Sequence, residues 1–262
     1  MAYETLILEK IGSIGKLTFN RPKVRNAYSK ALALEMNQGF AELAEDQAVK
    51  VIVLTGAEKA FMAGADINMV NDWSNLGDTV KINDDLTEMF SPNILEDCSK
   101  PTIAAVNGFA FGMGCELAIA CDFRIAAENA KFALPEIKLG IIPGGGGSQR
   151  MLHLVGATRA LEMIATGDPI DAQEAYRIGL VNQVVPQESL WEAVEIFASR
   201  LTDKGAAALK VCKRLIYEGG SLPIREGISF ERDRFCEILL TEDAAEGTKA
   251  FLEKRKPVFK GK

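Results

Sequence analysis

The 262-residue chain contains a single histidine, His153, and its five cysteines form no C-x-x-C pair. One histidine excludes zinc sites with two or more His ligands and every catalytic triad built on a different histidine. His153 lies in an apolar run, and we expect it to be a packed structural residue. The cysteines are odd in number and lie in apolar or helical runs, which is typical of reduced cytosolic thiols. Acid–base chemistry is therefore expected to come from carboxylates.

The sequence also lacks nucleotide-binding glycine motifs and a strong positive charge. Neither G-x-x-x-x-G-K-[ST] nor G-x-G-x-x-G occurs. Thirty Lys and Arg residues against 36 Asp and Glu residues give a net charge of −6. This charge argues against a broad nucleic-acid surface, so any phosphate is expected to bind at a local basic cluster. Residues 1–10 contain no apolar signal segment, and the apolar stretch 102–121 contains Asn107 and Glu116, which are costly in lipid. We expect a cytoplasmic protein without a membrane segment.

The first 187 residues alternate between strand and helix patterns. Residues 5–9 and 15–19 predict an N-terminal hairpin, and Ser29 is the expected N-cap of the following helix. Such alternation predicts an α/β layered fold. The later expected elements are strands at 49–56, 102–106, 123–126 and 180–185, a glycine turn at 108–114, a short helix at 115–121, and a helix that begins with an Asp171/Glu174 capping box.

Everything after residue 187 is helical or loop in its pattern. Apolar residues recur at helical spacing around 190–201, 206–218, 224–240 and 243–254. We therefore divide the chain into a core, residues 1–187, and a C-terminal helical region, residues 188–262. This region carries more apolar residues than a short appendage buries against itself, which predicts a subunit interface.

Two glycine-rich turns, residues 61–66 and 107–116, each lie beside an expected helix start and end with an acid. For one turn alone, tight packing of a strand against a helix is the simpler explanation. Two such turns brought together present unpaired N–H groups and the positive ends of helix dipoles. This arrangement can hold a developing oxyanion.

Two carboxylates stand out near these turns. Glu116 lies in the first turn of a helix that is otherwise apolar on every side, which indicates burial or the lining of a cleft. A favourable interaction with the helix dipole is the alternative explanation for its position. Glu136 follows Pro135 and precedes the glycine run 144–147, and its alternative is an exposed loop acid paired with Lys138.

Specific motifs extend over nearly the whole chain, at residues 20–22, 63–66, 100–116, 121–122, 135–144, 179–181 and 253–256. Together they resemble the crotonase (enoyl-CoA hydratase/isomerase) superfamily. The resemblance implies a crotonase-like spiral of β-β-α units with a C-terminal helical trimerisation region. It further implies a homotrimer, or a homohexamer built as a dimer of trimers.

The resemblance also implies an enoyl-CoA hydratase that uses no metal or separate cofactor, because coenzyme A is part of the substrate. It places an oxyanion hole on the backbone N–H groups of Ala65 and Met113, although glycine is common in the family at the second position. The acid–base pair falls on Glu116, which is expected to activate the water, and on Glu136, which is expected to protonate the α-carbon. Gly144 is expected near the water. Both carboxylates touch the same water, so their titrations are coupled.

Candidate CoA contacts follow from the same resemblance. They are Lys23, Arg25, Ala63, Asp66 and Ile67. The basic tail, which contains Lys254, Arg255, Lys256 and Lys260, is a further candidate that would reach a neighbouring subunit's site. A solvated basic tail is the alternative explanation.

Two other functions stay open at this point. An isomerase that shifts a double bond in an acyl-CoA needs only one acid–base carboxylate, and the superfamily also contains members that bind RNA. The net charge of −6 argues against the second function. The sequence does not define the length or shape of the acyl group. The expected loop 71–93, which should shape the acyl pocket, has no pattern that indicates a particular substrate.

Overall fold

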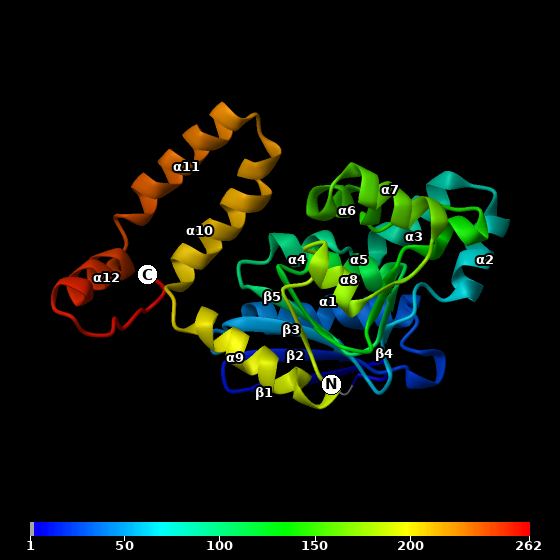
Figure 1. Cartoon of the computed structure of the whole chain (residues 1–262), viewed down its shortest axis with the longest axis horizontal. Coiled ribbons are helices and arrows are strands. Elements are labelled where there is room, and N and C mark those ends of the chain that lie inside the picture. The colour runs from blue at the N-terminus through cyan, green and yellow to red at the C-terminus, as the bar shows by residue number, and fades with distance from the viewer. Residues whose placement is uncertain (1–2) are drawn as a thin grey trace.

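The computed structural model describes residues 3–262, and its core is built on two β-sheets (Figure 1). In the larger sheet β1 is antiparallel to β2 and all other neighbours are parallel, whereas in the smaller sheet only β9 is antiparallel. The larger sheet has the order β1 (Leu6–Ile11), β2 (Ile14–Phe19), β3 (Val51–Gly56), β5 (Thr102–Val106), β7 (Phe123–Ala127) and β10 (Gln183–Val185). The smaller sheet has the order β4 (Ala60–Met62), β6 (Phe109–Phe111), β8 (Lys131–Ala133) and β9 (Ile170–Asp171).

From β3 to β8, consecutive strands alternate between the two sheets, and helical segments follow each pair. The pairs β3–β4, β5–β6 and β7–β8 each place one strand in the larger sheet and one in the smaller sheet. This repetition confirms the expected spiral of β-β-α units. The helices of the core are α1 (Lys30–Glu45), α2 (Ile67–Leu76), α3 (Thr79–Glu88), α4 (Asn93–Asp97), α5 (Met113–Ala120), α6 (Gly147–Val155), α7 (Ala157–Thr166) and α8 (Ala172–Arg177).

Local capping follows the sequence in part. The Ser29 side chain accepts a hydrogen bond from the N–H of Leu32 and begins α1, as expected. Asp171 accepts from the N–H of Glu174 at 2.8 Å and begins α8. The second half of that capping box is absent in residues 3–262, because the Glu174 carboxylate pairs with arginine side chains instead.

Other expectations need correction. The predicted turn at 108–114 contains strand β6, and the strand predicted at 180–185 is only β10. Three-residue strands are too short to show a period of two. The expected loop 71–93 is largely helical, since it holds the end of α2 and all of α3. His153 is exposed in the last turn of α6, where it faces solvent rather than packing inside.

The helix α9 (Leu190–Thr202) packs on the larger sheet. Leu190, Val194 and Ala198 lie in one apolar cluster with Val53 and Ile103. This helix therefore covers one sheet face, although it lies beyond residue 187. The division of the chain at 187/188 stays a prediction.

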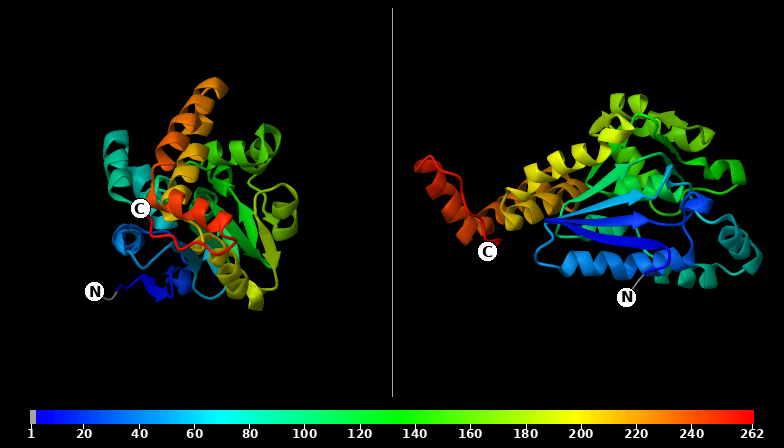
Figure 2. Two further views of the ribbon diagram at one scale, coloured as in Figure 1. Left: turned by 90° about the vertical axis from the view of Figure 1, so that its left-hand side faces the viewer. Right: turned by 90° about the horizontal axis from the view of Figure 1, so that it is seen from below.

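Three further helices project away from the core: α10 (Ala206–Tyr217), α11 (Ile224–Ile238) and α12 (Glu242–Leu252) (Figures 1 and 2). The second half of α10 is held by an ion pair between Lys213 and Asp122 at 2.9 Å. The hydroxyl of Tyr217 donates to the same carboxylate at 3.0 Å. These contacts fix the direction in which the C-terminal helices leave the core.

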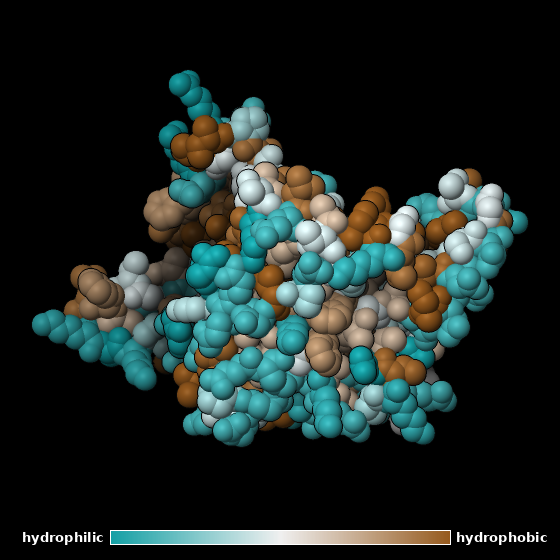
Figure 3. Space-filling model, turned by 45° about the vertical axis from the view of Figure 1, so that its right-hand side comes forward, coloured by the Kyte–Doolittle hydropathy of each residue, from teal (hydrophilic) through white to brown (hydrophobic). Residues whose placement is uncertain are grey.

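The projecting helices expose many apolar side chains. Neither α10 nor α11 has a buried residue in the described chain, and Leu240, Phe251 and Leu252 are more than 80% exposed. Figure 3 shows hydrophobic patches on this projecting part beside hydrophilic surface. A subunit interface would cover such patches, and the trimer stays a prediction.

The cysteines divide between the core and the projecting helices. Cys115 and Cys121 are buried, whereas Cys212 on α10 and Cys236 on α11 are exposed. Burial raises the pKa of the Cys121 thiol to about 12. Among residues 3–262, no helix is long and apolar enough to cross a membrane.

Candidate active site

Two glycine turns meet beside helix α5. Gly64 follows β4 and has φ of 106°, and Gly112 follows β6 and has φ of 49°. Residues with a side chain rarely adopt these positive φ angles, so glycine is required at both positions. A Cβ atom on Gly112 would lie 3.5 Å from the Cα atom of Gly64. The two turns predicted from the sequence are therefore in contact.

Each of these glycines is followed by a candidate N–H donor. Ala65 follows Gly64 and pairs with Tyr28 in an isolated bridge, in which Tyr28 N–H donates to Gly64 and Asp66 N–H donates to Tyr28. Met113 follows Gly112 and begins α5, so its N–H lies at the positive end of the helix dipole. Within residues 3–262, neither Ala65 nor Met113 donates its N–H to another group. Two such donors are available for a carbonyl oxygen.

Glu116 is buried in the first turn of α5, with 2% of its surface exposed. Its Oε1 accepts hydrogen bonds from the N–H of Gly145 at 2.7 Å and of Gly147 at 2.9 Å. Burial raises the pKa of Glu116 above its ordinary value, and these two N–H groups and the charge of Arg150 offset part of the rise. The carboxylate is thus held in one orientation and its charge is partly compensated.

Glu136 lies in the 3-10 helix Pro135–Leu139 and is half-buried. Its Oε2 is buried and has no hydrogen-bond partner in the described part of the chain. Burial, together with the charge of Glu116, raises the pKa of Glu136 to about 7. The alternative that Glu136 pairs with Lys138 is wrong, because Lys138 pairs with Asp168 at 2.7 Å.

Both carboxylates lie against the glycine turns. A Cβ atom on Gly112 would lie 2.9 Å from Glu136 Oε1, and one on Gly145 would lie 2.8 Å from Glu116 Oε2. The Glu136 carboxyl therefore lies next to the candidate donor Met113. Both carboxyl groups have raised pKa values, but only Glu116 accepts backbone N–H groups that favour its anion.

The glycine run 144–147 contributes differently from the sequence prediction. Gly144 is exposed, and a Cβ added there would meet nothing within 4 Å. Its place near a water stays a prediction. The residues that contact Glu116 are Gly145 and Gly147, which the sequence did not single out, although the run of four glycines was a signal that the backbone comes close to another group.

The candidate CoA contacts are partly brought together. Lys23 and Arg25 line one pocket of about 300 Å³, together with Lys59 and Phe109, which the sequence did not predict. The guanidinium of Arg25 lies 5.9 Å from the centre of the Phe109 ring. This pocket combines basic side chains with an aromatic surface.

The other three candidate CoA contacts, Ala63, Asp66 and Ile67, do not line this pocket. Ala63 donates its N–H to the Arg25 carbonyl at 3.1 Å. Asp66 is the N-cap of α2 and pairs with Arg21 at 3.2 Å, which lowers its pKa. Ile67 is exposed at the start of α2.

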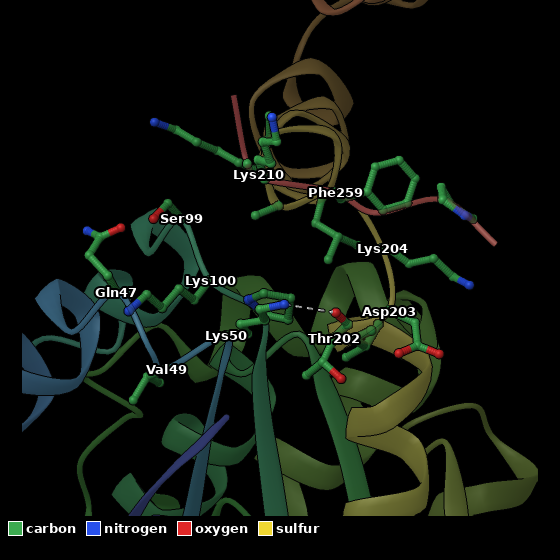
Figure 4. A pocket seen from close by; sticks show the side chains of 18 of the residues that line it. Gln47, Val49, Lys50, Ser99, Lys100, Thr202, Asp203, Lys204, Lys210 and Phe259 are labelled. Atoms are coloured by element: carbon green, nitrogen blue, oxygen red, sulfur yellow. Dashed lines mark hydrogen bonds between the residues drawn. The ribbon is translucent and has the colours of Figure 1, made fainter. Parts of the chain in front are cut away.

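The basic tail lies near its own core. Arg255 forms ion pairs with Glu246 and Glu253. Lys256 and Lys260 line a pocket of about 1000 Å³ that also contains lysines of the core and of α10 (Figure 4). Lys254 forms no ion pair in the described chain. A tail that reaches a neighbouring subunit's site stays a prediction.

A β-β-α spiral that carries a pair of unlike carboxylates beside free backbone donors is suited to acid–base chemistry at a carbonyl compound. The chain belongs to the enoyl-CoA hydratase/isomerase family, whose model matches residues 9–262. The resemblance to the crotonase superfamily is thereby confirmed.

Individual relatives match over the full length. The crotonyl-CoA hydratase of Syntrophomonas wolfei is 45% identical over 260 residues, which are 99% of each chain. The short-chain-enoyl-CoA hydratase of Clostridium acetobutylicum is 42% identical over 257 residues, covering 98% of this chain and 97% of the relative. A crystal structure of an enoyl-CoA hydratase subunit from Geobacillus kaustophilus superposes with a TM-score of 0.92 at 38% identity and covers 99% of both chains.

Proposed function

We propose that this protein is an enoyl-CoA hydratase that adds water reversibly across the 2,3-double bond of short, linear 2-enoyl-CoA thioesters. The observation that carries the chemistry is the unlike pair Glu116 and Glu136 beside the free N–H groups of Ala65 and Met113. The relatives named for crotonyl-CoA and for short-chain enoyl-CoA support the choice of acyl group.

In the proposed mechanism, the thioester oxygen accepts hydrogen bonds from Ala65 and Met113. The ionised Glu116 takes a proton from water, whose oxygen forms a bond to the β-carbon, and the π-electrons move to give an enolate on the thioester. The two N–H groups stabilise the negative charge on the enolate oxygen. Glu136 in its protonated form then gives its proton to the α-carbon. The product is 3-hydroxyacyl-CoA, and proton exchange with solvent restores the two carboxyl groups.

The pocket at Lys23 and Arg25 is the proposed site for CoA phosphates. Lys59 adds a third positive charge there, and the Phe109 ring offers a surface for a planar group. Phosphate groups bind to such local basic clusters even on a protein of net charge −6.

The proposal extends to the assembly and its compartment. The exposed apolar side chains of α11 and α12 support a homotrimer or a homohexamer, in which the Lys254–Lys260 tail serves a neighbouring site. The cytoplasm is the proposed location, since all five cysteines are free thiols of a kind common in reducing compartments.

The decisive experiment follows the ultraviolet absorbance of the 2-enoyl thioester. Incubation with 2-butenoyl-CoA should remove this absorbance and give 3-hydroxybutanoyl-CoA, identified by mass spectrometry. A series of linear thioesters of increasing length, with one cyclic substrate, then defines the acyl pocket. The isomerase alternative predicts the opposite sign, because a 3-enoyl-CoA would gain this absorbance while 2-butenoyl-CoA stayed intact. The relatives compared give no support to an RNA-binding role.

A further inference from the structure

The glycine run 144–147 lies between two charged side chains, those of Glu116 and Arg150. On one side, Cβ atoms on Gly145 and Gly147 would lie 2.8 and 2.9 Å from the Glu116 carboxylate oxygens. On the other side, a Cβ atom on Gly146, whose φ is 93°, would lie 2.1 Å from Nη1 of Arg150. The run therefore allows a guanidinium and a carboxylate to approach opposite faces of one backbone turn.

Arg150 is fixed by four hydrogen bonds. Its Nη1 donates to the Gly145 carbonyl at 2.8 Å. Its Nε and Nη2 donate to the two carboxylate oxygens of Glu96 at 2.6 and 3.0 Å, and Nη2 also donates to Asn93 Oδ1 at 2.5 Å. Glu96 and Asn93 lie in α4, so Arg150 connects α4 to the first turn of α6.

Gly145 is the direct link between Arg150 and Glu116. Its carbonyl accepts from Arg150, and its N–H donates to Glu116 at 2.7 Å. The positive charge of Arg150 also acts on Glu116 through space and lowers the pKa of that carboxyl. For Glu136, no positive side chain acts in this way among the described residues.

We propose that Arg150 is a positioning residue that holds the 145–147 turn against Glu116 and keeps this carboxylate ionised, so that the one proton of the pair resides on Glu136. This inference rests on the proposed hydratase function and deepens it. It gives the two carboxyl groups their roles before substrate arrives: Glu116 as the base for water and Glu136 as the acid for the α-carbon.

The other charged groups around Glu116 set the size of the effect. Glu136 is the nearest like charge, and Glu96 offsets part of the charge of Arg150. The Cys115 thiol on the same helix is buried and neutral, since burial raises its pKa. Arg124 on β7 directs its guanidinium to backbone carbonyls instead. Loss of Arg150 should therefore shift the titration of Glu116 by about 0.5–1 pH unit, less than for an isolated ion pair.

The test is the pH dependence of kcat and kcat/KM with 2-butenoyl-CoA in Arg150→Met, in Arg150→Lys and in the control Arg159→Met. Arg159 is an arginine of α7 with two glutamate partners and no ion pair with Glu116 among residues 3–262. In Arg150→Met, the acid limb, which is the fall of the rate at low pH, should move to higher pH by about 0.5–1 unit. Without the positive charge of Arg150, Glu116 takes up a proton more readily. In the same variant, kcat should fall about 10- to 100-fold and KM should change less than about threefold. Arg150→Lys should keep the acid limb in place, because lysine retains the positive charge. The value of kcat should still fall, because lysine lacks the planar guanidinium that donates to Glu96 and Gly145 together.

Glu96→Gln gives a shift of opposite sign. It removes the negative charge that offsets Arg150 and leaves a hydrogen-bonding amide, so the acid limb should move to lower pH. The double variant Arg150→Met/Glu96→Gln avoids an unpaired, half-buried carboxylate if the single variant folds poorly. It should keep the shift to higher pH.

Equal losses of activity at every pH, with unshifted limbs in both Arg150→Met and Glu96→Gln, would overturn the role of Arg150. Infrared difference titration of the carboxyl stretch, with Glu116→Gln subtracted, reads the protonation of Glu116 without turnover. A wild-type chain that hydrates no enoyl-CoA, yet shows this carboxyl shift in Arg150→Met, would refute the proposed function and leave the Arg150–Glu116 coupling intact. An absent carboxyl shift would refute the coupling itself.

Discussion

Glu116 and Glu136 differ in what surrounds their oxygens: Glu116 Oε1 accepts two backbone N–H groups, whereas Glu136 Oε2 is buried without a partner in the described chain. Hydrogen bonds from N–H groups favour the ionised form of a carboxyl group, and burial without them favours the neutral form. The two residues are therefore chemically unlike before any substrate binds.

The first prediction concerns the two carboxyl groups themselves. Glu116→Gln and Glu136→Gln should each lower kcat by at least about 10²-fold, the usual scale for a positioned acid or base, while affinity for a product CoA ester changes little. Steady-state kinetics and calorimetric binding measure the two effects. Glu45→Gln, at the exposed end of α1, is the control and should retain full activity. Near-wild-type hydration by either site variant would remove that residue from the mechanism.

The second prediction concerns the N–H of Met113. Met113→Pro removes this donor and should cost about 2.7–4 kcal/mol of transition-state stabilisation, whereas Met113→Gly keeps the donor and should stay active. Because Met113 is the first residue of α5, proline is tolerated there by the helix itself. Circular dichroism and oligomer size establish that the variant is folded. A folded and fully active Met113→Pro enzyme would disprove the oxyanion role.

The third prediction compares a glycine that lies against Glu116 with a glycine on the surface far along the chain. Gly145→Ala would place a methyl group 2.8 Å from Glu116 Oε2, closer than real contacts allow, so the carboxylate must move and kcat should fall about 10-fold or more. Gly220→Ala, in the exposed turn after α10, meets nothing within 4 Å and is the control. Parallel rate measurements on the two variants decide the point. Equal activity of both would mean that the contact between the turn and Glu116 is unimportant.

The fourth prediction concerns pH. Glu136 must be protonated to act as an acid and its pKa is about 7, so kcat/KM should fall as pH rises above about 7. The contribution of Glu136 to the free energy of unfolding should also fall as pH rises. The folded-state pKa of Glu136 lies above its ordinary value, so its contribution is full below pH 4.5 and is lost as pH rises to about 7.

Glu136→Gln, which mimics the neutral acid, tests this linkage. Its free energy of unfolding should equal that of the wild type at about pH 4 and exceed it at pH 8 by about 1–2 kcal/mol, after allowance for partial solvent screening. Urea denaturation at one protein concentration measures both values. A difference that is the same at both pH values would contradict the raised pKa.

The fifth prediction concerns assembly. Light scattering of the intact chain should report three or six subunits. The double variant Phe251→Glu/Leu252→Glu puts charges on two side chains that are more than 80% exposed, and it should shift the protein to smaller species. Lys249→Glu changes a charge on the same helix without removing apolar area and should assemble normally. A monodisperse, active monomer of the wild-type chain at micromolar concentration would contradict the interface.

The sequence predicts features that depend on local pattern. The hairpin of β1 and β2, the Ser29 cap and the placing of Glu116 in a buried helix all follow from spacing within a few residues. The motifs also predict the spiral, since they extend over nearly the whole chain. The sequence does not predict three-residue strands such as β4 and β6, because they are too short to show an alternating pattern.

The remaining features depend on contacts between distant residues. Gly145 donates to a carboxylate 29 positions earlier, and Arg150 pairs with Glu96 across 54 positions. The pKa of Glu136 depends on burial and on Glu116, neither of which a linear pattern encodes. Periodicity therefore identifies the elements, while the protonation states of the site arise only when the chain is folded.

The distribution of thiols gives the protein a built-in set of labels. Cys115 and Cys121 are shielded inside the core, whereas Cys212 and Cys236 are exposed on the two helices of the projecting hairpin, α10 and α11. Cys98, at the end of α4, is half-buried, and burial raises the pKa of its thiol, so it reacts less readily. A maleimide fluorophore should therefore attach to the hairpin and spare the catalytic core, because only an accessible thiolate reacts readily. The wild-type sequence is thus ready for fluorescence measurements of how its subunits come together, with no cysteine added or removed.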